Sequence, residues 1–114
     1  MRRITPQPAP SAVPDEDAVR RRLCGLLVQP SVRQELAAVF RRNRLHAEGP
    51  EREVDSFSLV EQLIADLSQE ALGLVAEVGG LRFTVEVRAD GGLVLHAHGW
   101  DEDQWRQVAA VTLG

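Results

Sequence analysis

The chain has 114 residues, of which 44% are hydrophobic and 26% charged, a composition typical of one globular domain with a hydrophobic core. No apolar run approaches the roughly 20 residues of a membrane-spanning helix, and the first residues lack the apolar segment of a secretory signal peptide. We therefore expect no membrane insertion. The single cysteine, Cys24, can form no internal disulfide, which fits the reducing cytoplasm.

Charge is distributed unevenly along a chain whose formal net charge is −4. Residues 1–46 contain nine arginines and four acidic residues, whereas residues 47–114 contain four arginines and 13 acidic residues. The two halves of such a chain can attract each other, or the chain can offer a basic surface to an acidic partner. Nucleic acid is disfavoured as a partner, because no aromatic residues interleave with the arginines.

The N-terminal part of the chain predicts a disordered tail followed by a helix. Residues 1–13 are rich in proline, which fixes its own φ angle and has no N–H to donate, so we expect an extended, unpaired tail. Asp15 and the two acids after it favour the start of a helix over about 15–28. Cys24 is expected to be a small core residue of that helix.

A second helix and a polar loop are expected next. Ser31, with a glutamine three residues later, has the spelling of a capping box and predicts a helix over about 31–43. Its last turn and the residue after it contain Arg41, Arg42 and Arg44. Residues 43–54 are expected to form a polar loop that turns at Gly49-Pro50 and exposes His46.

The third helix, predicted over about 56–70, has the strongest helical pattern in the chain. Asp55, Ser56 and Ser58 are all suitable caps for its first turn. Apolar residues then recur with helical spacing at Val60, Leu63, Ile64, Leu67 and Ala71. We expect this stripe to lie across the apolar face of a sheet.

Three antiparallel strands are predicted over about 73–78, 81–88 and 93–99. Apolar and polar residues alternate in each segment, as in strands with one buried face. A glycine pair between the first two strands is expected to form a two-residue turn that places Glu77 opposite Arg82. The strands would then form a meander with one apolar face.

The second turn of this meander predicts how the last two strands pair. A three-residue Asp-Gly-Gly loop needs a left-handed residue at its last position, and Gly92 supplies it without steric cost. This loop would place Val87 opposite Leu95. On the other face it would place Glu86 opposite His96.

The end of the chain is predicted to form a helix over about 102–112. Asp101 is the expected cap, and Trp100 and Trp105 occupy the two positions of a hydrophobic staple. The predicted fold class is therefore α+β: helices followed by a three-stranded antiparallel β-meander and a C-terminal helix. Residues 14–114 would form this single domain.

His96 and His98 are candidate metal ligands, because they point to the same side of one strand. Glu86 would complete three ligands of the kind that zinc accepts, but no fourth ligand is apparent. The alternative is an open sheet face with a cross-strand Glu–His pair. We therefore predict no metal and no cofactor.

A short motif resembles that of acyl and peptidyl carrier proteins. Residues 55–61, DSFSLVE, combine an Asp-Ser-hydrophobic turn with a Val-Glu pair at the spacing of that family. The resemblance implies a phosphopantetheine arm on Ser56. Carrier proteins are four-helix bundles, however, whereas strands are predicted here after this helix.

A longer stretch resembles the C-terminal domain of type III secretion length-control and substrate-switching proteins. The residues that carry this resemblance are LVEQLIADL, EALGLVAEV, LRFTVEVRADGG and LVLHAHG. It implies a bacterial, non-enzymatic module that docks on an export apparatus. Small secretion chaperones are a related interpretation.

These observations predict a non-catalytic, cytoplasmic protein–protein interaction module, with a carrier protein as the alternative. No enzyme is expected, since the sequence has no suggestive Ser-His-Asp spacing and no phosphate-binding glycine loop. Self-association through an exposed sheet edge also stays open. The predicted partner-binding residues are Arg41, Arg42, Arg44, Arg82, Glu86, His96 and His98.

Overall fold

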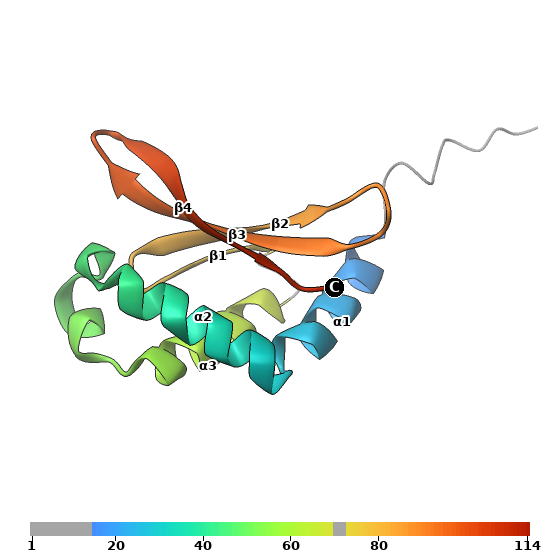
Figure 1. Ribbon diagram of the computed structural model, residues 1–114, viewed down its shortest axis with the longest axis horizontal. Helices are drawn as coiled ribbons and strands as arrows, with labels where there is room; N and C mark the ends of the chain where they lie inside the picture. Colours follow the sequence, from blue (N-terminus) through green and yellow to red (C-terminus); the bar gives the residue numbers. More distant parts are fainter. Residues whose placement is uncertain (1–14, 70–72) are drawn as a thin grey trace, which may run out of the picture.

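The computed structural model describes residues 15–69 and 73–114, and it places a layer of helices on one face of an antiparallel sheet (Figure 1). The tail predicted for residues 1–13 lies outside the described residues. The α+β class is confirmed, but the sheet has four strands rather than three. The elements are α1 (Glu16–Leu27), α2 (Pro30–Arg42), the 3-10 helices η2 (Arg44–His46) and η3 (Gly49–Glu53), α3 (Ser56–Leu67), β1 (Val75–Val78), β2 (Leu81–Val87), β3 (Leu93–Asp101) and β4 (Gln104–Thr112).

The three α-helices begin close to the predicted positions. Asp15 and Asp55 each accept hydrogen bonds from backbone N–H groups in the first turn of α1 and α3, which satisfies donors that have no partner within the helix. α2 begins at Pro30 rather than after Ser31, and its cap makes no side-chain hydrogen bond. The Ser31 capping box was therefore wrong. Proline suits a first helical position, where no N–H is needed.

The segment between α2 and α3 is more ordered than the predicted polar loop, since it forms η2 and η3. The Nε–H of Arg52 donates to the carbonyl of Ala47 at 3.0 Å and ties the two turns together. His46 was expected to be exposed but is half-buried. Its ring packs against Gly99 of β3.

The first hairpin has the predicted register. Glu77 lies opposite Arg82, and Val78 lies opposite Leu81. Gly79 and Gly80 form the turn with φ of +63° and +81°, as a two-residue turn between right-twisted strands requires.

The second hairpin differs from the prediction by two residues. Val87 pairs with Leu93 instead of Leu95, so the loop between β2 and β3 has five residues. Gly91, with φ of +89°, takes the left-handed conformation that was assigned to Gly92. Because side chains alternate with a period of two, a shift of two residues keeps the same apolar row on the inner face.

The predicted C-terminal helix over 102–112 is wrong, because this segment forms the strand β4. Glu102 and Asp103 have φ of +49° and +68° and form a tight turn between β3 and β4. β4 gives β3 a second hydrogen-bonded neighbour and buries Val111 in the core. These tertiary contacts outweigh the capping signals that favoured a helix.

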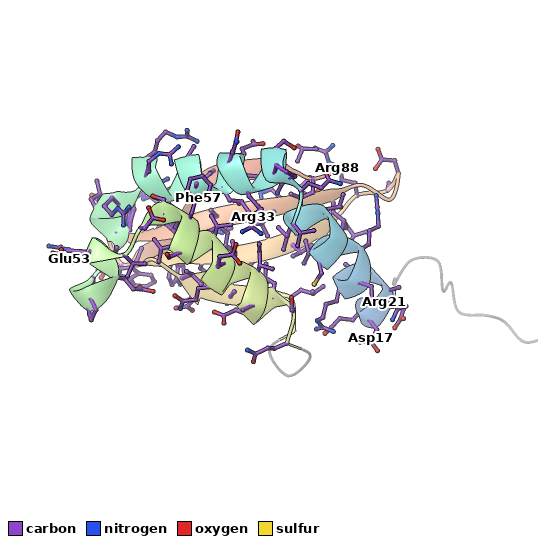
Figure 2. All side chains as sticks on the ribbon, turned by 90° about the horizontal axis from the view of Figure 1, so that it is seen from below. Asp17, Arg21, Arg33, Glu53, Phe57 and Arg88 are labelled. Atoms are coloured by element: carbon purple, nitrogen blue, oxygen red, sulfur yellow. The ribbon has the colours of Figure 1, made fainter. Side chains whose placement is uncertain are left out.

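The core lies between the helical layer, which Figure 2 shows from the side away from the sheet, and the inner face of the sheet. α3 packs on α2 and, in the sheet, on β1. Ala71, the last residue of its predicted stripe, lies outside the described residues. Phe40 of α2 and Phe83 of β2 contact each other with ring centroids 5.4 Å apart. The largest fully buried side chains besides these two are Leu23, Leu27, Leu36, Leu59, Leu63, Leu67, Leu81, Leu93 and Leu95.

Candidate binding groove

A groove of about 580 Å³ lies where the η2–η3 segment approaches the end of the β3–β4 hairpin. This end of the hairpin rises away from the helical layer at the left of Figure 1. The groove is lined by both tryptophans of the chain, by four acidic residues and by residues of η2 and the first hairpin turn. The lining residues are Leu45, His46, Glu48, Glu51, Glu77, Gly80, Trp100, Asp101 and Trp105.

The two tryptophans form a pair across the β3–β4 hairpin instead of a helix staple. Trp100 and Trp105 are directly opposite each other, with ring centroids 5.4 Å apart and planes at 77°. This edge-to-face arrangement is favourable for aromatic rings. Trp100 is nevertheless 53% exposed, and Leu45 beside the groove is 78% exposed.

His46 of η2 makes two close contacts with the sheet, one through its backbone and one through its ring. A Cβ atom on Gly80 would lie 1.9 Å from the carbonyl oxygen of His46, and one on Gly99 would lie 2.6 Å from the His46 ring. Neither position has room for a side chain. Glycine at these two positions therefore allows η2 to approach and to form one side of the groove.

The groove is strongly acidic, because Glu48, Glu51, Glu77 and Asp101 contribute four carboxylates. Glu51 accepts a hydrogen bond from the N–H of Gly79 at 3.1 Å, and Asp101 forms an ion pair with Arg106 at 3.2 Å. Within residues 15–69 and 73–114, Glu48 and Glu77 form no ion pair. Both are exposed and free to contact a positively charged ligand.

The outer face of the sheet, away from the helices, brings together four of the predicted contact residues: Arg82, Glu86, His96 and His98. Glu86 lies opposite Val94 rather than opposite His96. Its Oε1 still reaches Nε2 of His96 at 2.6 Å, as a diagonal cross-strand contact. The His98 ring lies 6.5 Å from the His96 ring.

Arg82 connects this outer face to the groove. Its guanidinium carbon lies 5.8 Å from the ring centroid of Trp105. Nε of Arg82 and Nδ1 of His96 are buried without a hydrogen-bond partner among the described residues. Such unsatisfied atoms are rare in folded proteins, and bound partners or ordered waters commonly satisfy them.

The predicted arginines near the end of α2 lie apart from this sheet face. Arg41 and Arg42 are exposed in the last turn of α2, where positive charge complements the helix dipole. Arg44 is half-buried and donates to the carbonyl of Val54 and, at 2.9 Å, to the hydroxyl of Ser56. Arg44 therefore connects η2 to the start of α3 instead of facing solvent.

The two reactive side chains singled out from the sequence lie away from the groove. Ser56 is only 4% exposed, so an arm attached to its hydroxyl would have to displace the Arg44 contact. Cys24 is half-buried rather than a core residue, and its Sγ lies 3.2 Å from Oγ of Ser68. Among the residues that the structure describes, no group of three or more metal-binding side chains is assembled.

Sequence reasoning missed the groove because it assigned Trp105 to a helix. The signal was present in WDEDQW, where two tryptophans flank four polar residues and become cross-strand partners if the middle two form a hairpin turn. The approach of η2 depends on Gly80 and Gly99, and no local pattern predicted that contact.

No family model, no curated protein and no solved structure matches the chain. None of the described helices is both long enough and apolar enough to cross a membrane.

Proposed function

We propose that this domain is a non-catalytic protein-binding module whose groove takes a partner segment with a basic and an apolar side chain close together. The observation that carries this proposal is the half-exposed Trp100, which stands beside the exposed Leu45 at the rim of an acidic groove.

The position of the tryptophans supports binding rather than packing. The chain has two tryptophans and no tyrosine, and both tryptophans lie at the end of one hairpin instead of in the core. Tryptophan contributes much of the binding energy at many protein interfaces, because its large ring buries apolar area and loses little conformational entropy. Trp100 therefore has the properties of an interface anchor.

The carboxylates define the charge of the partner. Glu48 and Glu77 can pair with an arginine or lysine, and the indole rings beside them attract a cation through their electron-rich faces. Arg82 over Trp105 shows that a guanidinium already lies against one face of this tryptophan pair. Phosphate-rich partners are disfavoured here, because the four carboxylates would repel them.

Calorimetric titration with two matched peptides tests this proposal. One peptide alternates arginine and leucine with glycine spacers, and the other has glutamate in place of each arginine. The arginine peptide is expected to bind, and more weakly as salt is raised. Trp100→Ala is expected to weaken its binding by at least tenfold, about 1.4 kcal/mol, through loss of the anchor.

Phe57→Ala is the matched control, since Phe57 is also an exposed aromatic residue, 44% exposed, that lies at the start of α3 (Figure 2) and does not line the groove. The affinity of the Phe57→Ala variant for the arginine peptide should equal that of the unchanged protein. Equal binding of both peptides, or full affinity in Trp100→Ala, would refute the proposed site.

The two resemblances noted in the sequence stay predictions. A role in type III secretion would give the module a bacterial export component as its partner. A carrier role would require Ser56 to become accessible, which its burial and its bond from Arg44 oppose.

A further inference from the structure

The two edges of the sheet differ in how they are protected from other chains. β1 is an edge strand of four residues that includes Glu77, and a short strand with a charge is a common form of protection. β4 is an edge strand of nine residues, and residues 107–114 contain neither a charged residue nor a proline. Within the described part of the chain, no strand pairs with its outer side.

Unpaired backbone groups lie along the last part of this edge. The N–H of Leu113 donates to the carbonyl of Leu93 at 2.9 Å, so Leu113 directs its N–H toward β3. Alternate residues of an antiparallel strand direct their backbone groups to opposite sides. Ala110 and Thr112 therefore direct N–H and C=O away from the sheet, and no described turn or loop bonds to them.

A β-bulge interrupts β4 nearer to the hairpin. Ala97 lies opposite Ala109 whereas His98 lies opposite Gln107, which leaves Val108 as the extra residue. A bulge twists an edge away from further pairing, but only locally. Beyond it, the last four residues of β4 keep a regular register with β3.

We propose that residues 110–112 of β4 pair antiparallel with the same residues of a second copy, with Ala110 opposite Thr112 of the other copy and Val111 on the two-fold axis, which joins the two sheets into one. Two molecules that each carry a formal net charge of −4 repel, and this uncharged segment is where they can approach closely. An antiparallel two-fold contact requires a segment that complements itself. The segment Ala110-Val111-Thr112 meets this need, because its two outward-facing residues face each other across the axis and β-branched residues pair well across strands.

This interface and the groove are separate. The groove uses Trp100 and Trp105 at the hairpin end, whereas self-pairing uses the opposite end of β4. A variant that no longer dimerises is therefore expected to keep peptide binding, and a variant that no longer binds the peptide is expected to keep dimerisation.

Sedimentation analysis over a range of protein concentrations tests the proposal. We expect a concentration-dependent species of twice 12.6 kDa. Ala110→Lys places like charges near the two-fold axis and is expected to raise the dissociation constant at least tenfold. Ala110→Pro removes an outward-facing N–H donor and is expected to raise the dissociation constant in the same way. The fold of the monomer should be kept, because proline is tolerated where an edge N–H faces solvent.

Gln62→Lys on the exposed side of α3 is the charge-matched control and should dimerise like the unchanged protein. Amide hydrogen exchange of the unsubstituted protein locates the interface without any variant. The N–H groups of Ala110 and Thr112 should be protected at high concentration and exchange freely on dilution. A monomer at every concentration, a dimer that both Ala110 variants retain, or unprotected amides in the dimer would overturn the proposal.

Discussion

Replacing Phe40 with alanine is expected to lower the free energy of unfolding by about 4 kcal/mol, the largest effect of any single change considered for this protein. Phe40 is 2% exposed and packs against Phe83 across the two layers. Its ring also lies against Gly79, where an added Cβ would come within 3.0 Å of it. Truncation would leave a cavity where α2 meets the first hairpin. Urea denaturation followed by circular dichroism measures the change.

Phe57→Ala removes the same atoms from a site that is 44% exposed, so its expected effect is below about 1 kcal/mol. A Phe40 variant as stable as the Phe57 variant would mean that the helical layer does not pack on the sheet as described.

The second large effect is expected for Gly80→Ala, which should lower the free energy of unfolding by about 3 kcal/mol. Gly80 has φ of +81°, and a Cβ there would meet the carbonyl oxygen of His46. The backbone of η2 must therefore move away from the hairpin. Because η2 forms one side of the groove, the same variant should also lose affinity for the arginine peptide.

Gly91→Ala separates the cost of the positive φ angle from the cost of the clash with His46, which together lower the free energy of unfolding of Gly80→Ala. Gly91 also has a positive φ, +89°, but an added Cβ would have nothing within 4 Å. Its expected loss is about 1 kcal/mol, from the backbone conformation alone. Equal losses in the two variants would show that η2 does not contact Gly80.

The helices and the first hairpin were predictable because local signals determine them. Aspartate caps at Asp15 and Asp55 and the stripe of α3 are physical causes that act within a few residues. The Gly79-Gly80 turn fixed the β1–β2 register for the same reason.

The second hairpin was predictable only in part. The alternation of apolar residues determines which face is buried, and it does so for any register shifted by two residues. The length of the loop determines the register itself, and both Gly91 and Gly92 were suitable turn residues. The side chains of Glu86 and His96 are still in contact despite the shifted register, because long side chains reach diagonal neighbours on the adjacent strand.

Local signals did not decide between a helix and a strand for the last segment, because WDEDQW suits both a helix start and a hairpin turn. Acids in a first turn favour a helix, yet Glu102 and Asp103 are here the two turn residues of a hairpin. What decides the outcome is the unpaired side of β3, a non-local partner that capping rules do not include. The groove was missed for the same reason, since its tryptophan pair exists only when residues 104–112 form a strand.

The central claim is that the Trp100–Trp105 pair beside the acidic groove is the binding site, and NMR titration of the isotope-labelled protein tests it most directly. We expect the indole N–H resonances of Trp100 and Trp105 to shift and saturate as the arginine–leucine peptide is added, while the resonances of α1 stay unchanged. Indole resonances that do not move while the peptide binds elsewhere would contradict it.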